Sequence, residues 1–91
     1  MYKFVAEYDK FKEDIMSIHE IQRTVIKKSG NTYRSVAPAF NVSSETSASK
    51  LGRGLRTIDD WIRLCDYCET RIFMECKDGT IIPLTIEDLE D

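Results

Sequence analysis

Two cysteines, Cys65 and Cys68, have the C-x-x-C spacing that is typical of zinc ligands and of redox-active thiols. A tetrahedral zinc site needs four ligands, and the other candidates are Cys76 and His19, the only histidine in the chain. The same spacing also puts Cys65 and Cys68 one turn apart on a helix, where free cysteines fill small core positions. We favour the core interpretation over zinc or redox chemistry, and we expect His19 to lie on the solvated surface.

A second group of residues has the chemistry to bind phosphates or bases. The stretch from Ser43 to Arg53 contains four serines, one threonine, Lys50 and Arg53, with few large side chains. Helices with a purely structural role on a surface use Glu, Lys, Gln and Ala more often. Small hydroxyl side chains also let a helix backbone come close to a phosphate or a base edge. The composition therefore favours a helix whose exposed face contacts a partner.

The charges are distributed unevenly along the chain, although the net charge is only −3. Residues 18–57 contain seven basic and two acidic residues, whereas residues 58–91 contain three basic and ten acidic residues. Phosphate binding depends on the potential within about one Debye length, ~8 Å at physiological salt, rather than on the total charge. We therefore expect the basic central part to face nucleic acid and the acidic C-terminal part to face away from it.

Other functional classes leave no clear signal in the sequence. No stretch approaches the ~20 apolar residues of a membrane-spanning helix, and the N-terminus lacks the basic and apolar regions of a signal peptide. A single histidine makes a Ser-His-acid set unconvincing, and Gly52 and Gly54 do not match a phosphate-binding loop. The sequence thus predicts a cytoplasmic, non-enzymatic protein with no cofactor, no metal and no membrane contact.

The 91 residues are predicted to form one small domain. Apolar and aromatic residues recur at helical spacing near the N-terminus, which predicts a helical extension over residues 1–16. A capping box formed by Ser17 and Glu20 predicts the start of the next helix, and Gly30 suits a left-handed stop after it. Thr57 is expected to cap the last helix of the bundle.

Residues 33–40 and 44–51 are predicted to be two short helices joined by a tight turn, with Ser43 capping the second. Pro38 disfavours a regular first helix, because a proline inside a helix removes one backbone bond and clashes with the carbonyl four residues before it. Either Ser35 is the true cap, so that Pro38 falls in the first turn, or the helix is kinked. We expect a short or distorted helix.

The C-terminal part changes from helical to strand periodicity. Residues 70–86 alternate apolar and polar side chains around Asp78-Gly79, which is a strong signal for a β-hairpin turn. Pro83 cannot donate a backbone hydrogen bond, so its strand should be an edge or should carry Pro83 on the unpaired side. Residues 87–91 are expected to be a solvated, frayed acidic tail.

The central segment, about residues 18–69, resembles the helix-turn-helix regulators of the lambda-repressor-like family, also called Cro/C1-type or XRE. In that family an alanine lies in the first helix of the motif, a small residue and Val-Ser form the turn, and the second helix ends in Arg-Gly. The positions that match this pattern are Ala37, Asn41, Val42, Ser43, Lys50, Leu51, Arg53 and Gly54. The resemblance implies a mainly α fold, a four-to-five-helix lambda-repressor-like bundle over residues 17–69, followed by the C-terminal β-hairpin.

The same resemblance implies a site for double-stranded DNA on this motif. The helix at 44–51 would lie in the major groove, and basic side chains near its ends would hold the phosphate backbone. The residues expected to hold phosphates are Tyr33, Arg34, Lys50 and Arg53, and those expected to face bases or phosphates are Ser43, Ser44, Glu45, Thr46 and Ser49.

Two positions depart from the family pattern. Ser47 occupies a place usually filled by an apolar residue such as valine, and Glu45 replaces a common glutamine that would read adenine. A carboxylate can accept a hydrogen bond from cytosine, but it repels nearby phosphates. The sequence thus supports two hypotheses. One is a sequence-specific, repressor-like transcriptional regulator that binds DNA as a homodimer. The other is a protein-binding module on the same fold, such as an antitoxin-like or phage-encoded inhibitor.

Overall fold

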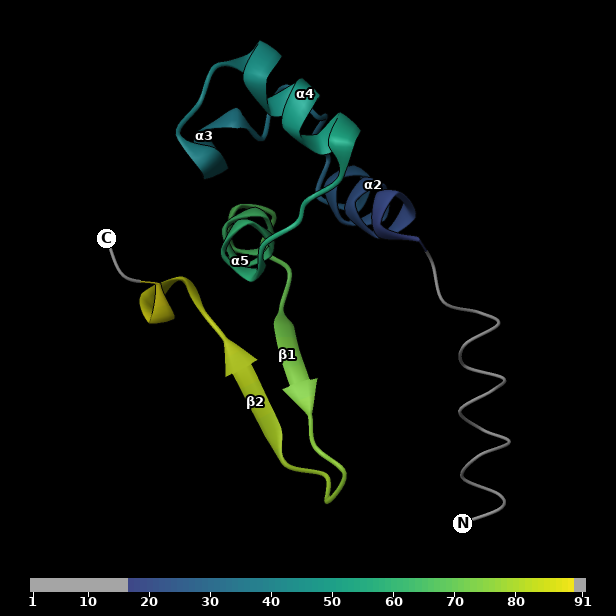
Figure 1. The fold of residues 1–91 in the computed structure, drawn as a ribbon, viewed down its shortest axis with the longest axis vertical. Helices are drawn as coiled ribbons and strands as arrows, with labels where there is room; N and C mark the ends of the chain where they lie inside the picture. The colour runs from purple at the N-terminus through teal and green to yellow at the C-terminus, as the bar shows by residue number, and fades with distance from the viewer. Residues whose placement is uncertain (1–16, 90–91) are drawn as a thin grey trace.

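The computed structural model describes residues 17–89, which form a small helical bundle with a projecting hairpin (Figure 1). The bundle contains four α-helices, and the hairpin contains two antiparallel strands followed by a short 3₁₀ helix. This confirms the predicted combination of a helix bundle with a C-terminal β-hairpin. The helical extension expected over residues 1–16 lies outside the described residues. No helix within residues 17–89 has both the length and the apolar character needed to cross a bilayer.

The first described helix, α2 (Ile18–Lys28), begins at the predicted cap. The Ser17 hydroxyl accepts a hydrogen bond from the Glu20 backbone N–H at 3.2 Å and donates to the Glu20 carboxylate at 3.3 Å. After the helix, Gly30 has a φ of +79°, a left-handed conformation that glycine adopts without steric cost. Both ends of this helix are therefore set by local chemistry that is visible in the sequence.

The next helix, α3 (Ala37–Phe40), is shorter than the predicted range 33–40. Pro38 has no N–H to donate to the Arg34 carbonyl, and the Ala37 N–H donates to that carbonyl at 3.2 Å instead. Residues 33–36 form a turn, and Pro38 falls in the first turn of α3, as one of the two alternatives predicted. The proposed cap at Ser35 was wrong, because Val36 occupies the N-cap position.

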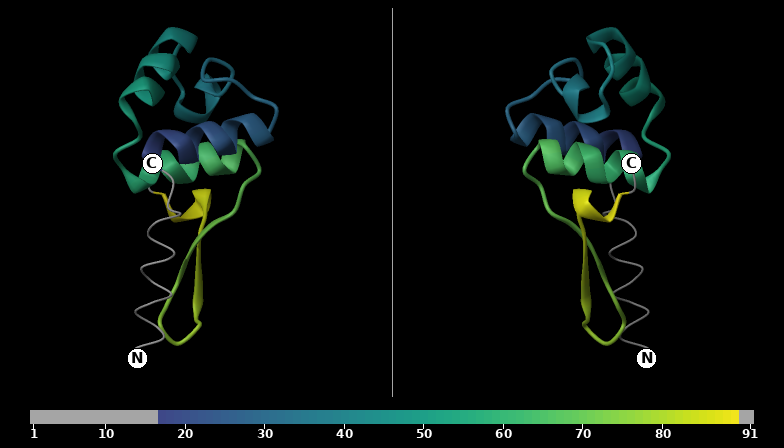
Figure 2. Two further views of the ribbon diagram at one scale, coloured as in Figure 1. Left: turned by 90° about the vertical axis from the view of Figure 1, so that its right-hand side faces the viewer. Right: turned by 90° about the vertical axis from the view of Figure 1, so that its left-hand side faces the viewer.

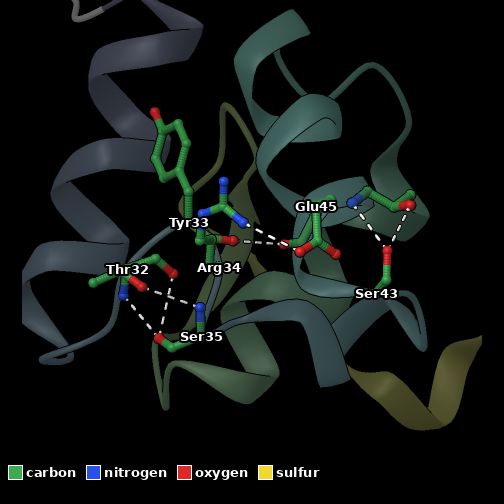
Figure 3. Close-up of polar contacts among 8 residues, drawn as sticks. Thr32, Tyr33, Arg34, Ser35, Ser43 and Glu45 are labelled. Atoms are coloured by element: carbon green, nitrogen blue, oxygen red, sulfur yellow. Dashed lines mark hydrogen bonds and ion pairs between the residues drawn. The ribbon is translucent and has the colours of Figure 1, made fainter.

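Ser35 instead closes the turn that precedes α3. Its backbone N–H donates to the Thr32 hydroxyl at 3.1 Å, while its own hydroxyl accepts from the Thr32 N–H at 2.8 Å (Figure 3). The Ser35 carbonyl accepts from the Tyr67 hydroxyl at 3.2 Å. These bonds hold the turn to the last helix, so the chain enters α3 in a fixed direction.

The second motif helix, α4 (Ser44–Arg53), is capped by Ser43 as predicted, because the Ser43 hydroxyl accepts from the Thr46 N–H at 3.2 Å. The helix runs two residues beyond the expected end at 51, so Gly52 and Arg53 are helical. It stops at Gly54, whose φ of +85° disfavours any other residue. A Cβ at Gly54 would also meet the His19 ring at 3.4 Å.

The last helix of the bundle, α5 (Ile58–Tyr67), is capped by Thr57, whose hydroxyl accepts from the Asp60 N–H at 3.2 Å. Its inner face completes the core between the three other helices. The buried cluster consists of Ile26, Val36, Leu51, Leu55, Leu64 and Cys68, with Val25, Tyr33, Phe40 and Trp61 packed around it.

A fully buried glutamine, Gln22, crosses this core from α2 to the end of α4. Its side-chain amide donates to the Leu51 carbonyl, and its side-chain oxygen accepts from the Leu55 N–H at 3.1 Å. A third contact joins the amide nitrogen to the Tyr33 hydroxyl at 3.3 Å. Since buried polar groups are costly unless they are paired, this network fixes how α4 lies on α2.

The hairpin consists of β1 (Ile72–Glu75) and β2 (Ile81–Leu84), paired antiparallel with Ile72 opposite Leu84. Gly79 has a φ of +92°, and the Asp78 carboxylate accepts from the Thr80 N–H at 3.0 Å, so the Asp-Gly turn is confirmed. Hydrogen bonds from the Thr80 side chain and backbone lower the pKa of Asp78. The hairpin leaves the bundle beyond α5, at the end opposite α3 and α4 (Figures 1 and 2).

The expectation of a frayed tail from residue 87 was wrong for its first part. Residues Ile86–Asp88 form the 3₁₀ helix η1, which contacts α5. The Asp88 carboxylate accepts from the Thr85 N–H at 2.9 Å and from the Thr85 hydroxyl at 3.2 Å. A threonine followed three residues later by an acid is a helix-start signal, and it is the reason that this segment is ordered into a turn.

Replacing Gln22 with leucine tests the buried network. The Leu55 N–H would lose its partner inside the core, and we expect a loss of about 2–3 kcal/mol in the free energy of unfolding. Urea denaturation followed by circular dichroism measures this loss. Arg23→Ala, at the exposed neighbouring position, is the matched control and should change stability by less than ~0.5 kcal/mol. Equal effects of the two substitutions would contradict a structural role for the amide.

Candidate nucleic-acid interface

The turn between α3 and α4 has the geometry that the sequence predicts. Asn41 adopts a left-handed conformation with φ 56° and ψ 47°, which asparagine tolerates better than most residues. Its N–H donates to the Pro38 carbonyl at 3.2 Å, and the Val42 N–H donates to the Ala37 carbonyl at 3.4 Å. The chain therefore reverses within three residues, and α4 starts immediately at its Ser43 cap.

One face of α4 is open to solvent along its whole length. Its exposed residues, Glu45, Thr46, Ser49, Gly52 and Arg53, recur at intervals of three and four and so form one stripe, which we call the α4 stripe. Ser44 and Lys50 flank it and are half-buried, while Ser43 is exposed at its start. The structure thus brings together on one surface the side chains that the resemblance assigns to bases.

Ser47 lies on the opposite, buried face of α4. Its hydroxyl donates to the Tyr33 carbonyl at 2.6 Å, which satisfies a backbone acceptor left free by the turn at 33–36. A valine would fill the same place but could not make this bond. The short α3 leaves the Tyr33 carbonyl outside a helix, and the Ser47 hydroxyl supplies its partner.

Tyr33 is turned toward the bundle rather than toward solvent. Its ring is half-buried against the core, and its hydroxyl lies 3.3 Å from the side-chain nitrogen of Gln22. In Figure 3 the ring points away from Arg34 and Glu45. The side chain predicted to touch a phosphate is thus part of the network that seats α4.

Arg34 and Glu45 point toward each other across the gap between the turn at 33–36 and the first turn of α4 (Figure 3). The Arg34 Nη1 and Glu45 Oε1 atoms are 3.6 Å apart, and their side chains are 63% and 75% exposed. An exposed pair of this kind contributes only ~0–1 kcal/mol, so a stronger partner could separate it. While it is formed, it neutralises one cation and one anion of the candidate interface.

Lys50 is held more tightly than Arg34. Its Nζ atom lies 3.0 Å from Asp60 Oδ2, and the two side chains are only 30% and 21% exposed. The ammonium group also lies 5.6 Å from the centre of the Phe40 ring, within the range of a cation–π contact. Lys50 therefore links α4 to α3 and α5. Asp60 belongs to the acidic C-terminal part of the chain, so the charge pattern along the chain did not predict its presence at this surface.

Three basic residues line a shallow hollow beside the end of α4. It is lined by Lys50, Arg53 and Arg56 together with Thr57 and Asp60 at the start of α5. Among residues 17–89, no ion pair is formed by Arg53 or Arg56, and both are exposed. The sequence reasoning missed Arg56, although its position two residues after Gly54 places it at the exit of the motif.

His19 lies at the other side of this exit. It is exposed, as predicted, and its Nε2 atom is 3.2 Å from the Gly52 carbonyl oxygen. The ring packs against Gly54 and thus helps to hold the end of α4 to the start of α2.

The cysteines are divided between the core and the hairpin. Cys65 and Cys68 are buried, as the core interpretation predicted, whereas Cys76 is exposed. Burial, with a smaller contribution from Cys68, raises the pKa of Cys65 from 9.0 to about 11. Within residues 17–89 no three His, Cys, Asp or Glu side chains gather in a way that could hold a metal ion.

Comparisons with family models, with curated proteins and with solved structures found no match to this chain.

The cysteine environments predict different reactivities toward a thiol reagent. At pH 8 in the folded protein, Cys76 should react fast, while Cys65 should stay protected, because its raised pKa lowers the thiolate fraction about 100-fold. A colorimetric thiol assay of the native protein and of Cys76→Ser, in which the fast phase should vanish, tests this assignment. Fast modification of Cys65 in the native state would contradict this assignment.

The raised pKa of Cys65 also predicts how the free energy of unfolding depends on pH. Because the folded pKa is raised, the stability that the neutral thiol contributes should be complete below pH 9 and should be lost as the pH rises toward about 11. Urea denaturation at several pH values measures this dependence, and an unchanged free energy of unfolding between pH 9 and 11 would contradict it.

Proposed function

We propose that this protein is a sequence-specific DNA-binding regulator of the helix-turn-helix class, non-enzymatic and repressor-like. One observation carries the proposal: the α4 stripe is a continuous exposed row that has small polar side chains, Thr46 and Ser49, at its centre and ends in Arg53. A helix of this kind fits the major groove of B-DNA, which is ~12 Å wide. The lambda-repressor-like topology is part of the same proposal, supported by the tight turn and by the Arg-Gly exit.

The roles of the side chains follow from their positions on α4. Thr46 and Ser49 lie at the centre of the stripe and would face base edges, together with Glu45. Arg34 and Arg53 lie at opposite ends of the motif and would hold phosphates on the two sides of the groove. Ser43 and Ser44 would contact phosphates through the first turn of the helix. Arg56 and Lys50 add positive charge beside Arg53.

A single motif of this size rarely gives tight and specific binding. A two-fold dimer would present two copies of α4 to half-sites about one helical turn apart, ~34 Å. We therefore propose a homodimer as the DNA-binding form. The position of the hairpin is compatible with this arrangement, because it leaves the bundle at the end opposite α3 and α4 and so does not obstruct the α4 stripe (Figure 1).

A specific observation favours the alternative of a protein-binding module. Arg34 is paired with Glu45 and Lys50 with Asp60, so two of the expected phosphate-binding cations already have carboxylate partners. A surface with both charges in fixed positions suits a protein partner with complementary charges. Selection of bound sequences from a random DNA duplex pool separates the two functions. Recovery of a palindromic consensus supports dimeric DNA reading, and absence of any enrichment favours the protein-binding module.

Arg53→Ala should weaken DNA binding. Loss of one phosphate contact is expected to reduce affinity for all sequences by about tenfold and to lower the slope of log affinity against log salt by ~1. Fluorescence anisotropy of a labelled duplex at several salt concentrations measures both quantities. Lys77→Ala removes an exposed cation from the hairpin turn and is the matched control. If Arg53→Ala binds like the unmodified protein, the proposed orientation of α4 on DNA is incorrect.

Glu45→Gln should strengthen DNA binding. The substitution removes a carboxylate that repels phosphates, releases Arg34 from its 3.6 Å pair and restores an amide that can bond adenine in two places. We expect an affinity gain of about tenfold and a salt slope that is steeper by ~1, because Arg34 then contacts a phosphate. Glu87→Gln, the same chemical change in η1, serves as the control. A gain of equal size in both variants would show an effect of net charge alone.

A further inference from the structure

The hairpin exposes apolar side chains on both of its faces. Phe73 and Ile81 are 48% and 44% exposed on one face, and Met74 and Ile82 are 54% and 43% exposed on the other. Only its base is partly buried, where Ile72 and Leu84 lie beside α5. An isolated two-stranded hairpin is marginal in water. The exposed apolar side chains of its outer half are therefore typical of two strands that contact a further strand.

The hydrogen-bond pattern shows which edge of the hairpin can accept that strand. In an antiparallel pair, hydrogen-bonded and non-hydrogen-bonded residue pairs alternate. The Cys76 N–H donates to the Thr80 carbonyl at 2.8 Å, so this pair belongs to the hydrogen-bonded set. The register then assigns the pairs Glu75–Ile81 and Phe73–Pro83 to the non-hydrogen-bonded set. The backbone groups of these four residues point outward.

The two outer edges differ in what they offer. On β2 the outward positions are Ile81 and Pro83, and Pro83 has no N–H to donate. On β1 the outward positions are Phe73 and Glu75, each with a complete N–H and C=O. Within residues 17–89 the sheet contains only these two strands, so the outer edge of β1 has no strand beside it. A free edge with intact donors is a template for strand addition.

We propose that β1 of a second copy of this chain pairs antiparallel with β1 along this edge, with Phe73 opposite Phe73 of the second copy. The two-fold axis passes through this pair and makes a four-stranded sheet. Phe73 then stacks on its symmetry mate, and Arg71 lies opposite Glu75 of the second copy, twice by symmetry. Arg71 and Phe73 already share one face, because the guanidinium lies 5.8 Å from the ring centre.

Charge complementarity selects this register over its neighbours. An axis through Met74 would place Arg71 opposite Lys77 of the second copy, and an axis through Ile72 would place Glu75 opposite Glu69 of the second copy. Like charges directly opposite each other destabilise a strand pair, whereas opposite charges and aromatic pairs stabilise it. Only the register centred on Phe73 joins two opposite-charge pairs with an aromatic pair.

The use of this dimer for reading two DNA half-sites rests on the proposed function. The pairing itself is measured in the absence of DNA, so the two ideas fail separately. A dimer that binds no DNA would overturn the DNA-binding function but not the pairing, and a monomer that binds DNA would overturn the pairing and the homodimer but not the DNA-binding function.

Charge reversal tests the register. Arg71→Glu places two carboxylates opposite each other across the seam, and Glu75→Arg places two guanidinium groups opposite each other; each should weaken the dimer about tenfold. The double variant, Arg71→Glu with Glu75→Arg, should restore it. An equimolar mixture of the two single variants should form a heterodimer, because every pair across the seam is then of opposite charge. Arg23→Glu, the same kind of charge reversal at an exposed position of α2 away from the hairpin, should leave dimerisation unchanged.

Sedimentation equilibrium between about 10 and 300 μM protomer measures these association constants, because dimerisation depends on protomer concentration. Circular dichroism of each variant establishes that the bundle is folded. A monomeric unmodified protein over this range would overturn the proposal. A dimer that is unaffected by either single reversal, or a mixture that fails to associate more tightly than the single variants, would overturn the register.

Discussion

The arrangement of the bundle depends on the buried amide of Gln22. Its side chain bonds to the Leu51 carbonyl near the end of α4 and to the Leu55 N–H in the connection to α5, so one residue of α2 orients both segments. Hydrophobic burial alone would hold α4 against the core, but it is not directional. Hydrogen bonds to a fully buried amide require one position and one rotation of the helix. The exposed α4 stripe is therefore presented in a fixed direction because the opposite side of the helix is bonded in place.

The features that the sequence predicted well are those set by neighbouring residues. The caps at Ser17, Ser43 and Thr57, the left-handed Asn41 and the Asp-Gly hairpin turn all depend on contacts within a few positions. The features that it did not predict join residues far apart in the chain. Gln22 reads as one polar residue on an amphipathic helix, and its burial depends on contacts 29 and 33 residues away. The same limit applies to the ion pairs of the candidate interface, since neither the Arg34–Glu45 nor the Lys50–Asp60 pair has a periodic signal.

The candidate interface combines open cations with cations that are already paired. Arg53 and Arg56 are exposed beside the end of α4, while Arg34 and Lys50 have carboxylate partners at 3.6 Å and 3.0 Å. The exposed Arg34–Glu45 pair is easily separated, but the Lys50–Asp60 pair is partly shielded from solvent and links three helices. Counting basic residues along the chain therefore overstates the charge that this surface offers to a phosphate. The nearest carboxylates, Glu45 of α4 and Asp60 of α5, decide which cations remain available to a phosphate.

Pro83 has a consequence for polymerisation. An exposed hairpin with apolar side chains on both faces is a hazard, because strands can add to it one after another and grow into a fibril. Pro83 removes the outward donor from β2, so growth in that direction lacks one backbone bond at its first step. If two hairpins join through β1, both outer edges of the resulting sheet carry this proline. Pro83 thus disfavours the addition of further strands and limits the assembly to a finite oligomer.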